Sequence, residues 1–251
     1  MNSTGVVGMP LNWLFEELLN LIFPGNNLCL LCSNPLENGA KALCSQCISK
    51  IAVVEAPVCL KCGKPLIERY GKTKCPDCLS TKRYFDQGRC VGEYKGILKE
   101  AVILYKYSGK KGLAVPLGFL MTQTLKQQDW PKPELIIPVP LSRKRLYHRG
   151  FNQSSLLAEV IGKEIGAPVS SRHLKRVKAT EHQTKLGKME RKENVRDAFC
   201  VLHGEDIRDR RILLIDDVYT TGATVNECSR MLRYAGAASI YVLTLATGRN
   251  L

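Results

Sequence analysis

The chain has 251 residues, 45% of them hydrophobic and 24% charged, so it can bury the core of one large or two modest domains, and this composition excludes a disordered protein. Its formal net charge is +14. Residues 1–80 carry 7 Lys/Arg and 6 Asp/Glu, which leaves 30 and 17 for residues 81–251, so the second region is expected to attract polyanions.

The N-terminal region, residues 1–27, contains the apolar segment LNWLFEELLNLIFP at residues 11–24. Its apolar residues recur at helical spacing, which predicts an amphipathic helix that ends at Pro24 and Gly25. The segment is too short to span a bilayer and lacks the basic start of a signal peptide. We therefore expect no transmembrane segment and a cytoplasmic protein, with the helix either packed on the protein or lying peripherally at the inner membrane.

Eight of the 11 cysteines form four Cys-x-x-Cys pairs, which predict a double zinc ribbon at residues 28–80. Two pairs can complete one tetrahedral Zn²⁺ site, so two structural zinc ions are expected. Disulfides or redox-active dithiols are the competing interpretations, but four pairs within fifty residues favour metal. The predicted ligands are Cys29, Cys32, Cys44, Cys47, Cys59, Cys62, Cys75 and Cys78.

The pairing of these motifs is open on spacing alone. Neighbouring pairs can meet in sequence order, and a cross-braced arrangement is equally compatible with the spacing. Gly63 directly follows a pair and suits the left-handed turn of a zinc knuckle. Ser33, Ile48 and Leu79 at the matching places do not, so the first site is the less regular one.

Residues 81–251 alternate between strand and helix patterns. Strands are predicted at residues 88–94, 135–139, 211–215 and 238–245, and helices at residues 95–107, 113–127, 154–165 and 224–234. Strands that alternate with helices pair in parallel through right-handed crossovers. The sequence therefore predicts an α/β domain with a mostly parallel sheet flanked by helices.

A basic loop, PLSRKRLYHRGFNQ, follows the predicted strand at residues 135–139. Open α/β sheets bind ligands beyond the carboxyl ends of their strands, so this loop is a candidate site for a pyrophosphate. A solvated basic turn is the plain alternative. The candidate residues are Ser142, Arg143, Lys144 and Arg149, with Arg145 beside them.

Further along, residues 172–196 hold nine Lys/Arg and three acids without an apolar period. Such a segment is expected to be mobile and to bind anions.

The most informative stretch is RILLIDDVYTTGAT at residues 211–224. An apolar strand there leads into Asp216 and Asp217, and then into a Thr/Gly turn that starts a helix. The N–H groups of a helix start bind phosphate, while two carboxylates suit ribose hydroxyls and a hard cation such as Mg²⁺. An acidic strand end followed by an ordinary helix cap is the alternative. Asp216 and Asp217 are the candidate catalytic residues, and the candidate phosphate loop is Thr220, Thr221, Gly222, Ala223 and Thr224.

This motif resembles the signature of type I phosphoribosyltransferases, which bind 5-phosphoribosyl-1-pyrophosphate (PRPP). Together with the cysteine pairs, YKGILKEAVILYKYSG, RGFNQ and TEHQTKLGKMERKENV, in this order, it is similar to the ComF family of competence proteins. The resemblance implies a double zinc ribbon before a phosphoribosyltransferase domain. It also implies a mobile loop over the site with Arg176, Gln183, Arg191 and Asn194.

The same resemblance implies that the protein binds PRPP with Mg²⁺ and assists the passage of single-stranded DNA across the inner membrane in natural transformation. The implied partners are the translocase ComFA and the recombination mediator DprA. The alternative is a Mg-dependent phosphoribosyltransferase of nucleotide or salvage metabolism with no DNA role. Its acceptor is open, although Thr220 stands where 6-oxopurine transferases carry an acid, which argues against that substrate class.

Overall fold

The computed structural model describes residues 28–37, 42–66, 73–178 and 195–248. The predicted N-terminal helix and the predicted loop residues Gln183, Arg191 and Asn194 lie outside these ranges. Within them, no helix combines the length and hydrophobicity needed to cross a bilayer.

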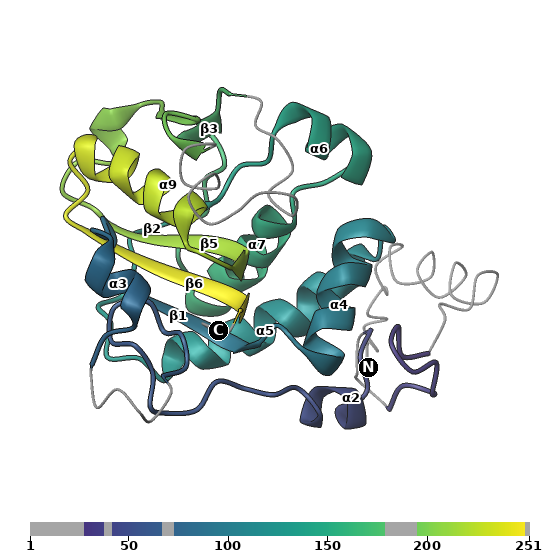
Figure 1. The fold of residues 1–251 in the computed structure, drawn as a ribbon. Coiled ribbons are helices and arrows are strands. Elements are labelled where there is room, and N and C mark those ends of the chain that lie inside the picture. Colours follow the sequence, from purple (N-terminus) through teal and green to yellow (C-terminus); the bar gives the residue numbers. More distant parts are fainter. Residues whose placement is uncertain (1–27, 38–41, 67–72, 179–194, 249–251) are drawn as a thin grey trace, which may run out of the picture.

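A four-stranded parallel sheet forms the centre of the fold, in the order β1-β6-β5-β2 (Figure 1). Its strands are β1 (Gln87–Glu93), β2 (Leu135–Pro138), β5 (Arg211–Tyr219) and β6 (Ser239–Thr247). The predicted parallel α/β architecture is therefore confirmed. Strand β5 is longer than predicted, because Asp216 and Val218 still pair with Thr244 and Ala246 of β6. The two aspartates thus lie within the strand and not in the loop after it.

Helices cover both faces of this sheet. Helices α4 (Gly96–Tyr107), α5 (Ala114–Lys126) and α7 (Gln153–Ile165) share one buried cluster with Leu213 and Ile215 of β5. On the other face, α9 (Ala223–Tyr234) shares a second cluster with Ile212 and Leu214. This alternation follows from the period of two along a strand, and it explains why the apolar run carries no polar residue: both of its faces are buried.

Several short elements differ from the sequence-based expectation. The basic loop contains a helix, α6 (Arg143–Arg149), which Ser142 caps and Gly150 ends with φ +73°. The basic segment that we expected to be irregular contains β3 (Leu174–Arg176), which pairs antiparallel with β4 (Phe199–Val201). Two single turns, Lys111–Leu113 and Gly204–Asp206, complete the connections. Neither α6 nor β3 is long enough to show an apolar period, so capping and one buried side chain, Leu174, define them instead.

The cysteine-rich region packs on the sheet domain at two separate places. Helix α2 (Ser45–Ser49) and helix α3 (Pro76–Ser80) each start directly after a cysteine. Cys29, Cys44 and Cys47 belong to the buried cluster of α4 and α5, and Cys59, Cys62 and Cys75 to the cluster of α9. Figure 1 accordingly shows α2 near α4 and α3 on the side of the sheet where α9 lies.

Candidate functional site

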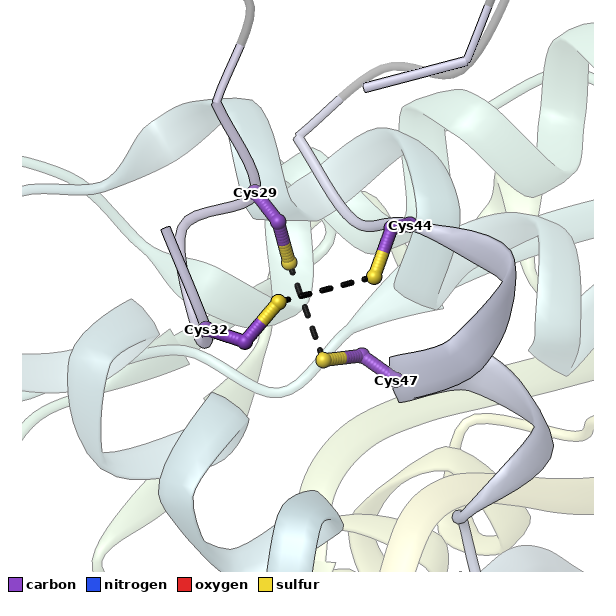
Figure 2. A group of neighbouring side chains, drawn as sticks. All are labelled: Cys29, Cys32, Cys44 and Cys47. Carbon is purple, nitrogen blue, oxygen red and sulfur yellow. Dashed lines mark hydrogen bonds between the residues drawn. The ribbon is translucent and has the colours of Figure 1, made fainter. Parts of the chain in front are cut away.

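Cysteines 29, 32, 44 and 47 form the first candidate metal centre. Figure 2 shows their four sulfur atoms turned toward a common centre. The sulfur atoms of Cys29 and Cys47 are 3.7 Å apart, and those of Cys32 and Cys44 are 3.6 Å apart. A tetrahedral site with Zn–S bonds of about 2.3 Å requires separations of about 3.8 Å, so the four thiols fit a structural zinc ion.

A second group, cysteines 59, 62, 75 and 78, has the same geometry. The sulfur atoms of Cys62 and Cys75 are 3.6 Å apart, and within each group all ligand atoms lie within 4.8 Å of one another. The motifs therefore pair in sequence order, the simpler of the two arrangements that spacing allowed.

The first site was expected to be less regular because Ser33 and Ile48 stand where a knuckle glycine would lie, and the structure shows how both knuckles form without it. Gly63 adopts a left-handed conformation with φ +73°, and Ser33 adopts it too with φ +58°. Ile48 and Leu79 lie instead in the short helices α2 and α3. The second knuckle of each site is thus a helical turn, which needs no glycine, and both sites form.

A pocket of about 230 Å³ lies at the carboxyl ends of β5 and β2. Its walls come from the loop after β5, the loop after β2, α4, α6 and β3. Four cations, Lys106, Arg145, Arg149 and Arg176, line it together with two acids, Asp216 and Asp217. The pocket therefore has an excess of positive charge, which suits a ligand with several anionic groups.

The acidic pair is held by neighbours from two helices. Lys106 of α4 donates to Asp217 across 2.9 Å, and both side chains are nearly buried. Ser154 of α7 donates to Asp216 across 3.1 Å, and so does the Asp217 amide at 2.9 Å. Burial, followed by the charge of Asp217, raises the pKa of Asp216 to about 7. A cation that binds beside this carboxyl would stabilise its charged form.

The threonine loop leads from β5 into α9. Gly222 adopts φ +74° at the start of the helix, and a side chain there would collide with the hydroxyl of Tyr219. Thr220, Gly222, Ala223 and Thr224 line the pocket. The start of α9 therefore lies at a cavity lined by cations, which suits a phosphate-binding helix start. Thr221 differs, since its hydroxyl accepts from the Ala223 amide.

Three arginines converge on the opposite wall. Burial and the nearby Arg149 lower the pKa of Arg145, and burial and the nearby Arg145 lower the pKa of Arg176. Mutual repulsion among guanidinium groups is relieved by a bound anion. Arg149 is oriented by Gln153, whose amide oxygen accepts from it at 3.0 Å, and by the Tyr107 ring 5.1 Å away.

The RGFNQ sequence has a structural role in this wall. Gly150 ends α6, and Phe151 packs against Tyr105 with ring centroids 5.7 Å apart. Asn152 caps α7 by accepting from the Ser154 amide, and donates to the Val139 carbonyl across 3.0 Å. The motif thus fixes the loop after β2 and aims Arg149 at the pocket.

Among the predicted basic-loop residues, the structure brings Arg145 and Arg149 to the pocket, with Ser142 as the cap of α6. Arg143 and Lys144 are exposed, because the helical turn directs Arg145 and Arg149, four residues apart, to one side. Arg176, which the resemblance assigned to a mobile loop, is the last residue of β3 and lines the pocket. Lys106 was missed by sequence reasoning. The sequence carried no signal that singled it out, since Lys99 and Glu100 lie on the same helix.

The comparisons bear on both parts of the chain. A model of the double zinc ribbon domain matches residues 18–79. Among solved structures, the chain is similar to glutamine PRPP amidotransferase from B. subtilis, with a TM-score of 0.40 and 17% identity. That match covers 57% of this chain and only 30% of the amidotransferase. Purine phosphoribosyltransferase from Pyrococcus horikoshii is similar over 53% of this chain and 73% of its own, with a TM-score of 0.32 and 22% identity.

Similar sequences cover nearly the whole chain. Competence protein F of Haemophilus influenzae is 32% identical over 226 residues, which span 88% of this chain and 97% of that protein. DNA utilization protein YhgH of Escherichia coli (strain K12) is 31% identical over 229 residues, or 90% and 98% of the two chains. Competence protein ComFC of Bacillus subtilis is 28% identical over 87% and 94%. With relatives this similar over almost their full length, the chain belongs to the ComF family of competence proteins.

Proposed function

We propose that this protein binds PRPP together with Mg²⁺ in the pocket at the ends of β5 and β2, and that it assists the uptake of single-stranded DNA in natural transformation. The observation that carries the first part is one pocket that joins a helix start, an acidic pair and three arginines. PRPP needs all three, since it carries a 5-phosphate, ribose hydroxyls and a pyrophosphate.

In this proposal each group of residues has one task. The backbone amides at the start of α9 and the hydroxyls of Thr220 and Thr224 bind the 5-phosphate, and three arginines, Arg145, Arg149 and Arg176, neutralise the pyrophosphate. Asp216 and Asp217 accept from the ribose hydroxyls, and their oxygens fit the hard cation that accompanies PRPP. Bound Mg²⁺ would supply further neutralisation of the pyrophosphate charge. If an acceptor attacks C1 of the ribose, the arginines stabilise the departing pyrophosphate.

Calorimetric titration with PRPP, with and without Mg²⁺, tests this part. Asp216→Asn with Asp217→Asn removes the charge of the acidic pair and keeps its shape, so PRPP affinity in Mg²⁺ should fall at least about tenfold, the effect of losing one charge-assisted hydrogen bond. Zinc content should stay the same. A wild-type protein that does not bind PRPP refutes the proposal. A pyrophosphate-release assay with candidate acceptors then distinguishes an enzyme from a binding module.

The DNA role is supported by the names of the relatives, competence protein and DNA utilization protein, and by the positive charge of residues 81–251. We expect binding of single strands that weakens as salt rises, because counterions are released. ComFA and DprA are the partners expected in that process. Transformation of a competent host that carries the double Asn variant is the decisive test. Wild-type transformation despite lost PRPP binding would show that DNA uptake does not require the pocket.

A further inference from the structure

The second cysteine group lies directly behind the phosphate loop. Asp77 stands between the ligands Cys75 and Cys78 and is 4% exposed. Its carboxylate pairs with Lys64 across 3.0 Å, and Lys64 is 3% exposed. A buried ion pair of this kind tolerates little displacement, because separating the two charges leaves each uncompensated. The knuckle is therefore a rigid body on which a neighbouring loop can rest.

Arg83 connects this knuckle with the phosphate loop. Its guanidinium donates to the carbonyl of Thr221 across 3.1 Å and reaches the carbonyl of Asp77 at 3.5 Å. One planar group thus joins the backbone between two zinc ligands to the backbone at the centre of the loop. The same bond holds the Thr221 carbonyl toward the knuckle, and Thr221 is not among the residues that line the pocket.

Tyr219 forms a second connection. Its ring contacts Phe85 edge to face with centroids 6.5 Å apart, and the ammonium of Lys64 lies 5.6 Å from its centre. On its other side the tyrosine hydroxyl lies so close to Gly222 that no side chain would fit there. The left-handed turn of the loop is consequently packed on a ring that the knuckle supports.

The start of α9 is tied to the same segment. Asn226 accepts from the amide of Tyr84 across 2.9 Å and donates to the carbonyl of Lys82 across 3.1 Å. These bonds fix residues 82–84, which lead out of the ribbon, against the first turn of α9. The loop, the ring below it and the helix start therefore all rest on residues 82–85 and the second knuckle.

We infer that the second zinc knuckle is a structural part of the phosphate site and that Arg83 is the positioning residue that connects them. This inference rests on the proposed PRPP function. The four thiols around the second centre fit zinc, and zinc there would hold α3, Asp77 and thus Arg83 in place. The first centre lacks such contacts in the described part of the chain: its buried cysteines pack with α4 and α5 instead. The two ribbons thus differ in role despite their similar geometry.

Arg83→Met is the sharpest test, with Arg89→Met as its matched control. Arg89 also donates to a carbonyl of the second ribbon, that of Leu60 at 3.3 Å, but contacts no residue of the phosphate loop among those that the structure describes. Both variants are tested by calorimetry with PRPP and Mg²⁺, by zinc analysis and by amide exchange of residues 219–226. Arg83→Met should weaken PRPP binding about tenfold and speed exchange in the loop, with zinc content unchanged. Arg89→Met should leave the PRPP affinity and the exchange rates of the loop within about twofold of the wild-type values.

Equal exchange of the loop in the two arginine variants overturns the inference. If the wild-type protein does not bind PRPP, the proposed function fails, while the exchange experiment still decides whether Arg83 holds the loop. A second pair of variants tests the metal itself, using the more exposed ligand of each centre. Cys78→Ser should speed exchange at residues 219–226, whereas Cys32→Ser should not. A loop that responds equally to both substitutions contradicts the assignment.

Discussion

Lys106 shows how one side chain makes an acidic pair tolerable in the pocket. Its ammonium lies 2.9 Å from Asp217, and Asp216 is adjacent in the chain. Two adjacent carboxylates with little exposure repel each other, and a nearby cation offsets this repulsion. Lys106 supplies that cation from α4, so the helix and the carboxyl end of β5 depend on each other.

Replacing Lys106 by Met should therefore destabilise the protein by about 3 kcal/mol at neutral pH, because it leaves a buried carboxylate uncompensated. Urea unfolding measures this loss. Lys99→Met, at an exposed position of the same helix, is the control and should change the free energy of unfolding by less than about 0.5 kcal/mol. Adding Asp217→Asn to Lys106→Met should recover most of the loss. Equal effects of the two lysine substitutions would show that the ion pair contributes nothing.

Asp216 gives the stability a pH dependence of known sign. Its pKa rises from an ordinary 3.8 to about 7 on folding, mainly through burial. A carboxyl whose pKa is raised stabilises the folded state below its unfolded pKa, and this contribution is lost as pH rises through the folded pKa. The free energy of unfolding of wild type relative to Asp216→Asn should thus decrease between about pH 4 and pH 7. Urea titrations of both proteins across this range check it, and a constant difference would contradict it.

At the scale of elements, α6 divides its cations between two surfaces. It lies wholly within the described residues, and its side chains are exposed or partly buried. Arg145 and Arg149 line the pocket, while Arg143 and Lys144 face solvent beside Tyr147, which is 86% exposed. Cations next to an exposed aromatic ring are typical of surfaces that bind single strands.

The two surfaces of α6 should respond to different substitutions. Arg149→Gln should weaken PRPP binding about tenfold or more, because a charge-assisted hydrogen bond to the pyrophosphate is lost. Arg143→Gln with Lys144→Gln should leave PRPP affinity within about twofold. The same double variant should reduce the salt dependence of single-strand binding by up to roughly 1.4 in logarithmic slope. Calorimetry and fluorescence anisotropy measure the two effects, and a PRPP defect in the double variant would place the pyrophosphate elsewhere.

The limits of sequence-based prediction are visible at the same scale. Long apolar patterns, such as Ile212–Ile215, predicted strands and their parallel pairing correctly because burial on both faces leaves a strong signal. The end of β5 was misplaced, since polar residues continued the strand through backbone pairing with β6. The pocket residue Lys106 could not be predicted, because its role depends on how α4 packs across the sheet. Arg83 was missed for the same reason, since its partner Thr221 lies far away in sequence.

At the scale of the whole molecule, the ribbons are integrated in the core and are not a separate appendage. Their buried cysteines share clusters with the sheet helices, and Gly63 packs on the backbone of Gly88 and Arg89 in β1. Residues 52 and 54 also bond to β1, through Ala52 with Glu93 and Val54 with Val91. Zinc should therefore stabilise the sheet as well as the ribbons.

Elemental analysis should find close to two zinc ions per chain, and their removal should lower the unfolding midpoint of the entire protein. Each site can contribute about 10 kcal/mol or more of apparent folding free energy to its ribbon. Trp130, which stacks on Tyr241 of β6 with centroids 4.7 Å apart, reports on the sheet by fluorescence. A chelator should shift its thermal transition to lower temperature. An unchanged transition would mean that the ribbons fold independently of the sheet.

The sheet order has a consequence for synthesis on the ribosome. Strand β1 is made early, yet its neighbour in the described sheet is β6, the last strand in chain order. The thiols of each ribbon lie close in sequence and can take up zinc as soon as they emerge. The surface on which the ribbons rest forms only when β6 is released, because β1 cannot join the sheet earlier. The nascent chain thus carries completed metal sites with uncovered apolar faces through most of translation, a period in which chaperone contact is expected.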